Sequence, residues 1–374
     1  MSVTLFFAPL AVSLLSAGLA FLIAVLDKVV NNYGQVSIDI NGGKRKLSVK
    51  GGAPLLSTMS EQQIFIPSAC GGRGSCGACK CKVLSDVGPH LPTETPYMTA
   101  EEKSQNVRLA CQIKLKKDIA IEIPEALFNI RRYKGTVEKI RDLTYDIKEV
   151  LVRLDDPTEV SFTAGQYGQI EVPPYDKIKE MNSRAYSMSS RPGDKNHLEF
   201  LVRLVPGGIV TGYVFKYLKE GQQLNVVAPV GDFHVRDTDA IMLCVAGGSG
   251  MAPFKAIFTD MIDAGRTQRE IWYFFGARSK RDLFYLDELE DIKKRYGEKF
   301  HYVMALSEPL PGDDWKGETG LITQVLDRYI PKEIDSSRPR EGYLCGSPGM
   351  LDACIAVMRK QNVPQEKIYF DKFA

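Results

Sequence analysis

The chain has 374 residues, of which 44% are hydrophobic and 25% are charged, and its formal net charge is +2. At about 150 residues per domain, this length predicts two or three domains. The near-neutral charge argues against a nucleic-acid binder, because such proteins gather Lys and Arg in a strongly basic domain. Five of the eight cysteines lie within residues 70–111, which argues against a disulfide-stapled protein and for a reducing compartment.

The first 26 residues carry no charged side chain and are long enough to cross a bilayer core, which needs roughly 20 apolar helical residues. They predict a transmembrane anchor over residues 1–30. A cleaved signal peptide is the alternative, but no Lys or Arg precedes the run, and the apolar core of a signal peptide is only about 7–15 residues long. Basic residues follow at Lys28 and at 44–46, so the positive-inside rule places the remaining chain in the cytoplasm.

A small β domain is predicted after the anchor, over residues 31–130. Residues 34–52 alternate polar and apolar side chains around Asn41-Gly42-Gly43, a pattern that predicts a β-hairpin. Further strand-like residues, "RLACQIKLKKDIAIEIP", extend to Pro124. The cysteine-rich segment therefore lies inside this small domain.

Three cysteines share the glycine-rich loop "CGGRGSCGAC", and a fourth follows in "RLACQI". Zinc sites of four cysteines usually combine two C-x2-C pairs, and here the second pair is missing. The spacing C-x5-C-x2-C with a distant fourth cysteine is close to the plant-type pattern of a [2Fe–2S] cluster. The predicted ligands are Cys70, Cys76, Cys79 and Cys111.

The glycines of this loop have a role under the same hypothesis, because they let the backbone wrap tightly and turn its N–H groups toward the sulfurs. They are Gly71, Gly72, Gly74 and Gly77. A structural zinc loop is the alternative. Cys81, two residues beyond Cys79, is either a rival ligand or a buried small side chain.

The second half of the chain changes its periodicity once. Residues 135–231 alternate like strands, with Gly and Pro at short intervals, and indicate an antiparallel barrel or sandwich with one helix at 211–221. From residue 240, apolar runs at 240–248, 270–278, 300–307 and 342–347 are separated by helical patterns at 251–262, 282–297 and 349–363. Such alternation indicates a parallel sheet covered by helices on both faces.

The segment "VAGGSGMAPF" joins an apolar strand to an amphipathic helix through a glycine-rich turn. Gly247, Gly248 and Gly250 would let a phosphate approach the backbone where the helix begins. Because the full G-x-G-x-x-G pattern is missing, an ordinary tight turn between strand and helix is the alternative.

The segments "RAYSMSS" and "VPGGIVTGYVF" together resemble the flavin-dependent ferredoxin reductase family, whose Arg-x-Tyr-Ser motif lies on the flavin barrel. The resemblance implies that Arg184 holds the FAD pyrophosphate, Tyr186 packs on the isoalloxazine ring and Ser187 lies near flavin N5. It also implies phosphate contacts at the start of the predicted helix, from Gly208, Ile209, Val210 and Thr211. An ordinary barrel strand and turn would explain the same residues without a ligand.

Two later segments, "FGARSKRDLFY" and "YLCGSPGM", match the positions where this family binds the nicotinamide cofactor. The implied contacts are Gly276, Arg278 and Ser279 on the adenosine side, Cys345 and Gly346 beside the nicotinamide, and Phe373 over the flavin ring. The implied catalytic residues are Tyr186, Ser187 and Cys345. A buried core cysteine is the alternative for Cys345. The basic residues at 278–281 leave NADPH open as an alternative to NADH.

The order of these parts, with "RAYSM", "GMAP", "GARSKR" and "LSEPLPGDDWKGETG", resembles the family of F subunits of sodium-translocating NADH:quinone reductases over essentially the whole chain. The implied architecture is a transmembrane helix, a β-grasp ferredoxin-like [2Fe–2S] domain, an antiparallel β-barrel FAD domain over 131–236 and an α/β nucleotide-binding domain with a parallel sheet over 237–374. The resemblance implies a single-pass protein of the cell inner membrane with cytoplasmic domains.

The implied activity is electron transfer from NADH through FAD to the [2Fe–2S] cluster, and on to the integral-membrane subunits of a quinone reductase complex. Sodium pumping belongs to those partners, because one helix without intramembrane charges cannot carry it. Two alternatives remain: the reductase component of an oxygenase, and a membrane-anchored iron–sulfur sensor or assembly subunit without turnover.

Overall fold

The computed structural model describes residues 12–23 and 32–372, which form two compact units. The first unit comprises Met1–Ser68 and Gly72–Leu127, and the second comprises Ala69–Gly71 and Phe128–Ala374. Residues 12–23 are helical, with exposed apolar side chains. Within the described ranges, no helix is both long and apolar enough to span a membrane. The other residues of the anchor predicted over 1–30 lie outside these ranges.

The first unit is built on a mixed five-stranded sheet in the order β2-β1-β5-β3-β4. The predicted hairpin is confirmed: β1 and β2 pair antiparallel, and Asn41 and Gly42 between them have φ of 53° and 66°, the left-handed conformation that a tight hairpin turn needs. β5 adds parallel to β1, a pairing that requires a long crossover and brings the end of the domain back to its start. The strands are β1 (Gln35–Ile40), β2 (Arg45–Lys50), β3 (Lys80–Val83), β4 (Val107–Leu109) and β5 (Ile119–Glu122).

Helix α2 (Leu55–Glu61) buries Leu55 and Met59 completely in the core. The remaining helical segments of the unit are short. Besides residues 12–23, they are η1 (Thr95–Tyr97), α3 (Ala100–Ser104), η2 (Ala110–Gln112) and η3 (Glu125–Asn129), the last of which runs on into the second unit.

A buried ion pair stabilises the long connection between β3 and β4. Arg108 Nη2 donates to Glu94 Oε2 at 2.7 Å, with side chains 3% and 0% exposed, and the Glu94 carboxylate also accepts from the backbone N–H of Leu91 and Leu109. Burial by itself would raise the pKa of Glu94, but these hydrogen bonds outweigh it and hold the pKa below its usual 4.5.

Replacing Glu94 with glutamine is expected to destabilise the first unit by about 3–5 kcal/mol, because Arg108 is left buried without its counter-charge. Faster hydrogen exchange of the β3 and β4 amides, read by mass spectrometry, measures the loss. A lowered folded-state pKa stabilises the fold above the unfolded-state pKa, so the deficit of E94Q should be full at pH 7 and shrink as the pH falls below 4.5. The exposed Lys82–Glu122 pair is the control, and an equal loss in E122Q would contradict the prediction.

The second unit begins with six antiparallel strands in the order β10-β7-β6-β11-β8-β9. A bridge between Met188 and Phe200 joins the two edges, so the sheet closes into the predicted barrel. Inward side chains such as Val150, Val152 and Ile170 fill its interior. The elements are β6 (Arg131–Asp142), β7 (Ile147–Asp156), β8 (Tyr167–Val172), β9 (Asn182–Ser187), β10 (His197–Arg203), α4 (Ile209–Lys216) and β11 (Gln223–Val230).

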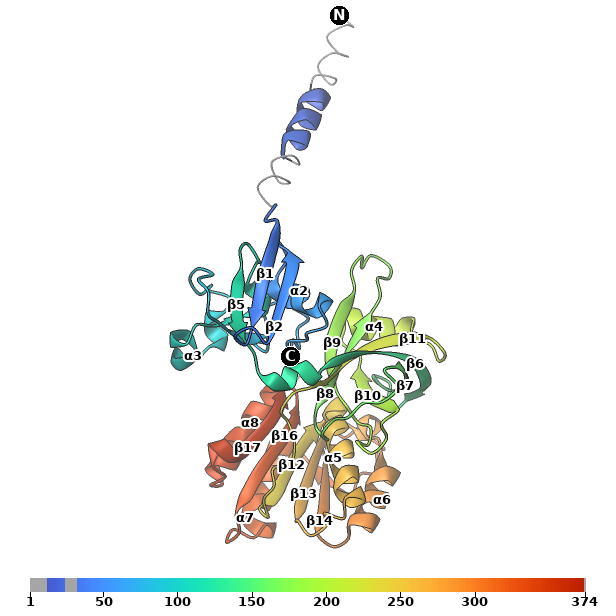
Figure 1. Cartoon of the computed structure of the whole chain (residues 1–374). Helices are drawn as coiled ribbons and strands as arrows, with labels where there is room; N and C mark the ends of the chain where they lie inside the picture. The colour runs from blue at the N-terminus through green and yellow to red at the C-terminus, as the bar shows by residue number, and fades with distance from the viewer. Residues whose placement is uncertain (1–11, 24–31, 373–374) are drawn as a thin grey trace, which may run out of the picture. The chain divides into compact units, whose positions relative to one another are not determined.

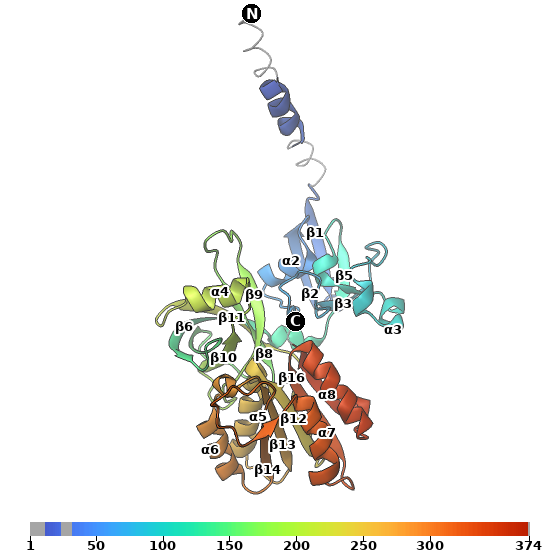
Figure 2. The same ribbon diagram turned by 180° about the vertical axis from the view of Figure 1, so that it is seen from behind.

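The same unit continues into a six-stranded, fully parallel sheet in the order β15-β14-β13-β12-β16-β17. Alternate residues of β12 enter two different cores: Met242 packs with helices α5 and α6, and Leu243 packs with α7 and α8. The helices accordingly cover opposite faces of the sheet (Figure 1 and Figure 2). Both faces are buried, which explains why these strands are continuous apolar runs.

The strands of this sheet are β12 (Ile241–Gly247), β13 (Ile271–Ala277), β14 (Phe300–Leu306), β15 (Glu318–Thr319), β16 (Arg340–Gly346) and β17 (Ile368–Lys372). The helices are η4 (Gly248–Gly250), α5 (Met251–Asp263), η5 (Lys280–Asp282), α6 (Leu286–Tyr296), α7 (Ile322–Glu333), α8 (Pro348–Lys360) and η6 (Gln365–Lys367). The chain reverses its direction of travel across the sheet beside β12, so the carboxyl ends of β12 and β16 flank a switch point where α/β folds bind ligands.

Candidate functional site

All four glycines of the cysteine loop have positive φ angles, which bulkier residues seldom adopt. The φ angles of Gly71, Gly72, Gly74 and Gly77 are 66°, 85°, 73° and 69°. A Cβ atom at Gly77 would also lie 2.7 Å from Cβ of Tyr97, closer than packed atoms approach. Glycine is therefore required there by both backbone conformation and space.

Strand pairing brings cysteines from two distant segments together. Lys80 of β3 pairs with Leu109 of β4, and the N–H of Ala110 donates to the Cys79 carbonyl at 2.8 Å. The Cys111 thiol lies close enough to the Cys79 thiol to raise the pKa of Cys79, and Cys76 acts in the same direction.

Two N–H groups approach these sulfurs: the Ala78 amide lies 3.5 Å from Cys76 Sγ, and Gln112 Nε2 lies 3.6 Å from Cys111 Sγ. Converging thiols with N–H donors fit a thiolate-held iron–sulfur cluster. No group of three or more His, Cys, Asp or Glu side chains in the described part of the chain is arranged to hold a metal ion, so the assignment of all four ligands stays a prediction.

The flavin motif lies on β9, the edge strand that the Met188–Phe200 bridge ties to β10. Tyr186 packs against the barrel core, and burial raises the pKa of its hydroxyl, an effect that the nearby Arg184 charge partly offsets. Arg184 Nη1 donates to the Ser183 carbonyl at 2.6 Å. The structure therefore places Arg184 and Tyr186 close together at the barrel edge.

The residues predicted to contact a phosphate at the start of α4 also make hydrogen bonds within the protein. The Thr211 hydroxyl accepts from the Val205 N–H at 3.2 Å, and Tyr175 Oη donates to the Ile209 carbonyl at 2.6 Å. The hydroxyl of Thr211 is thus engaged within the protein. The Gly208 N–H donates to the Val205 carbonyl at 2.9 Å, so what this segment can offer a phosphate is the backbone N–H groups of Ile209 to Thr211, which have no partner inside the helix.

The two halves of the second unit meet at Ser187, Cys345 and Asp371. Cys345 and Asp371 are register partners on β16 and β17, and Ser187 Oγ of the barrel donates to Asp371 Oδ2 at 3.1 Å. Cys345 is 0% exposed. Burial raises the pKa of the Cys345 thiol and of the Asp371 carboxyl, so this corner disfavours both anions.

This corner joins two of the predicted catalytic residues, Ser187 and Cys345, with one that sequence reasoning missed. The only sequence signal for Asp371 is its place in "FDKFA", two residues before Phe373. Phe373 itself lies outside the described residues.

The glycine-rich turn has a packing role beside its expected ligand role. A Cβ atom at Gly250 would lie 2.2 Å from the Cys345 carbonyl oxygen, and one at Gly247 would lie 2.9 Å from Met350 Sδ. Gly248 has φ of 55° and packs beside the Arg203 guanidinium, which a Cβ atom would approach to 3.2 Å. Arg203 is thus a cation at the turn that sequence reasoning also missed.

On the predicted adenosine side, the three residues behave differently. Arg278 is exposed and pairs with Glu308 at 3.0 Å, whereas Ser279 is only 3% exposed and donates its hydroxyl to Asp282 Oδ2 at 2.6 Å. A Cβ atom at Gly276 would lie 2.9 Å from Cβ of Ile322, so this glycine lets α7 pack on the sheet. Arg278 is therefore the predicted contact whose side chain faces solvent, and the ligand roles of all three stay predictions.

Three protein-family models match this chain in succession. The 2Fe-2S iron-sulfur cluster binding domain matches residues 38–116, the oxidoreductase FAD-binding domain matches 134–235, and the oxidoreductase NAD-binding domain matches 244–355. Each match falls on one of the three sheets described above.

The chain is also similar to whole proteins. The F subunit of the Na(+)-translocating NADH-quinone reductase of Marinomonas sp. is 34% identical over 95% of this chain and 94% of the relative, and that of Idiomarina loihiensis is 36% identical over 91% and 92%. Among solved structures, the Amycolatopsis cytochrome P450 reductase GcoB has a TM-score of 0.72 at 26% identity, covering 90% of this chain and 98% of that one. The ferredoxin reductase in carbazole 1,9a-dioxygenase has a TM-score of 0.68 at 28% identity, covering 91% and 99%.

The likeness to the F subunits is higher in identity than the likeness to these oxygenase and P450 reductases, and it extends over nearly all of both chains. The chain therefore belongs to the family of F subunits of Na(+)-translocating NADH-quinone reductases.

Proposed function

We propose that this chain is the NADH-oxidising subunit of a membrane quinone reductase complex, and that it passes electrons from NADH through FAD to a [2Fe–2S] cluster. The observation that carries the proposal is the succession of cluster, FAD and NAD domains in one chain, at 34–36% identity to F subunits. FAD, when bound, accepts hydride from NADH and releases electrons singly, as the cluster requires.

The residues at the edge of the barrel would hold the flavin. Arg184 supplies a cation for the pyrophosphate, the start of α4 supplies backbone N–H groups, and Tyr186 supplies an aromatic face. Hydride transfer itself requires no acid–base pair and no nucleophilic triad. The polar contact that the described residues make at this corner is the one between Ser187 and Asp371. Ser187 presents a hydroxyl held by Asp371, and the buried Cys345 thiol helps to exclude water from the same corner.

The nucleotide domain favours NADH over NADPH. Arg278, one of three exposed cations at 278–281 that could hold a 2′-phosphate, is already paired with Glu308 at 3.0 Å. A phosphate in this position would meet the Glu308 carboxylate, and like charges at close range disfavour binding.

The apolar N-terminus and the names of the relatives both support a location at the membrane. The uncharged first 26 residues anchor the chain in the cell inner membrane, with its domains in the cytoplasm and in contact with the integral-membrane subunits. Sodium translocation is a property of the complex, since one uncharged helix offers no ion path.

A second function, as the reductase of an oxygenase, is favoured by the solved structures, which include a P450 reductase and a dioxygenase reductase at 26% and 28% identity. The apolar N-terminus and the higher identity to F subunits count against it. The two functions differ in the electron acceptor, not in the path from NADH to the cluster.

An anaerobic titration of the full-length protein with NADH, and then with NADPH, tests the proposal through the flavin and cluster absorbance. We expect NADH to bleach both chromophores at low concentration and NADPH to do so only at much higher concentration. Bound flavin and cluster that stay oxidised under excess NADH would overturn the proposal and leave the sensor or assembly role.

A further inference from the structure

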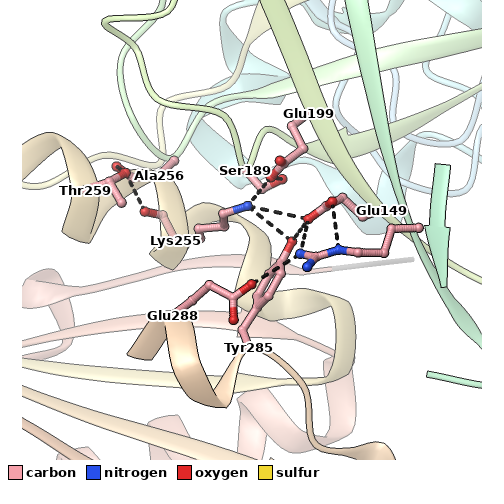
Figure 3. Close-up of polar contacts among 9 residues, drawn as sticks. Glu149, Ser189, Glu199, Lys255, Ala256, Thr259, Tyr285 and Glu288 are labelled. Atoms are coloured by element: carbon pink, nitrogen blue, oxygen red, sulfur yellow. Dashed lines mark hydrogen bonds and ion pairs between the residues drawn. The ribbon is translucent and has the colours of Figure 1, made fainter. Parts of the chain in front are cut away.

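The barrel and the nucleotide domain are joined by a buried polar cluster, here termed the barrel–nucleotide network (Figure 3). Its members are Arg141, Glu149 and Glu199 of the barrel strands and Lys255 and Tyr285 of the nucleotide domain. Lys255 Nζ donates to Glu199 Oε1 at 2.5 Å and to Tyr285 Oη at 3.3 Å, and lies 3.6 Å from Glu149 Oε2. Tyr285 Oη in turn donates to Glu149.

The centre of the network is largely desolvated: the side chains of Glu149, Glu199 and Lys255 are 9%, 15% and 21% exposed, whereas Arg141 at its edge is 43% exposed. Burying such charges costs most of what their attraction returns, so an ion pair of this kind is a weak source of stability. The ion pair instead fixes the geometry of its partners, because a charge-assisted hydrogen bond holds them at one distance and in one orientation. A network of this kind at a domain boundary therefore fixes the position of one domain on the other.

Tyr285 gives a second, independent observation. Its backbone has φ of 57° and ψ of 31°, a left-handed conformation that a bulky side chain seldom adopts. The Tyr285 ring lies under Lys255, 4.5 Å from Nζ, and beside the Arg141 guanidinium at 5.4 Å. The surrounding contacts thus hold a residue in a strained conformation at the domain boundary, as is common at functional positions.

The network also reaches both cofactor motifs. Lys255 lies on α5, about one turn beyond Gly250 of the glycine-rich turn. On the barrel side, Ser189 of "RAYSMSS" donates its hydroxyl to Glu199 Oε1 at 2.7 Å and its N–H to the Glu199 carbonyl at 2.8 Å. Glu199 therefore has two partners. Its side chain binds Lys255 on α5, the helix that follows the glycine-rich turn, and its side chain and backbone bind Ser189 of the flavin motif.

We propose that Lys255 and Tyr285 are positioning residues for hydride transfer, which set the distance between the glycine-rich turn and the flavin-motif strand. This role rests on the proposed function. Lys255 and Tyr285 lie outside the glycine-rich turn and the flavin motif and would act by holding those motifs in place. Hydride transfer needs its reacting atoms about 3–3.5 Å apart, and a displacement of about 1 Å costs roughly 100-fold in rate. The pair acts through Glu199 and Glu149, which hold the two domains at the separation that the reaction needs.

Stopped-flow reduction of the flavin by NADH, in full-length protein with matched FAD and cluster content, tests the proposal. K255M should lower the limiting rate of flavin reduction by roughly 10- to 100-fold while the half-saturating NADH concentration changes little. K255R, which keeps the charge, should recover part of the rate. K360M is the control, because Lys360 of α8 pairs with Asp327 of α7 at 2.8 Å and neither belongs to the network, so its rate should stay at the wild-type value.

Two further variants separate positioning from fold stability. Y285F removes one hydroxyl without emptying the core and should lower the limiting rate in the same direction. K255M/E199Q removes both charges of the closest pair, so its melting temperature should recover relative to K255M while its rate stays low.

A rate that recovers with the melting temperature, or wild-type rates in K255M and Y285F, would overturn the positioning role. Failure of the proposed function has a different signature, because wild-type flavin would then not be reduced by NADH at all.

Discussion

C79S is expected to abolish electron transfer beyond the flavin while NADH still reduces the flavin itself. Cys79 is 1% exposed, lies beside Cys111, and its carbonyl accepts from the Ala110 N–H at 2.8 Å. A serine hydroxyl stays protonated near neutral pH and replaces a thiolate poorly as an iron ligand. Loss of the visible absorbance and of the electron paramagnetic resonance signal of the dithionite-reduced cluster measures the effect, with FAD content unchanged.

C81S is the matched control for C79S. Cys81 is equally buried, at 3% exposed, and lies only two residues further on, at β3. We expect C81S to keep the cluster signals and the electron output of the wild type. If C81S lost the cluster and C79S kept it, Cys81 would be the ligand in place of Cys79, and the ligand assignment would be contradicted.

S187A is expected to slow hydride transfer by about 100-fold, within the range for a hydroxyl that stabilises or relays charge at a reacting atom. The Ser187 hydroxyl is buried and held by Asp371 at 3.1 Å, in the corner that Cys345 closes. The rate of flavin reduction at saturating NADH measures the effect. The half-saturating NADH concentration should change little, because Ser187 is held at the reacting corner and not on the predicted adenosine side.

S190A provides the control for S187A from the same segment. Ser190 is also buried, and among the residues that the structure describes its hydroxyl has no hydrogen-bond partner. Removing that hydroxyl should leave the rate of flavin reduction near the wild-type value. Equal losses in S187A and S190A would show that the effect comes from packing in this segment, and the assigned role of Ser187 would be wrong.

Much of the fold follows from local patterns. The hairpin at Asn41-Gly42, the alternating strands of the barrel and the change to parallel strands near residue 240 all depend on residues close together in the sequence. Helix α7 was not among the predicted helices, although Ile322, Val325, Leu326 and Ile330 share one face with helical spacing. The strand β17 was also missed, because a strand of five residues at a sheet edge has too few apolar positions to stand out.

The candidate site was predicted only where one short segment carries it. Ser187 and Cys345 could be named from their motifs, but Asp371 could not, since a single aspartate near the end of a chain has no distinctive neighbours. Gly250 was expected to admit a ligand, and the structure gives it a further steric reason in the Cys345 carbonyl. Thr211 and Ser279 are predicted ligand contacts whose hydroxyls also bond within the protein, and their ligand roles stay predictions.

The sequence by itself determined the chemistry: the order of the domains, the cysteine spacing and the motifs that define the family. Most of these features are local, because each cofactor motif is one short segment and three of the four predicted cluster cysteines share one loop. The tertiary structure alone decided which distant groups meet, namely Ser187 with Asp371, Arg203 with the glycine-rich turn, and Lys255 with Glu199. Barrel closure and the crossovers of the parallel sheet create those contacts, and neither leaves a periodic signal in the residues that finally touch.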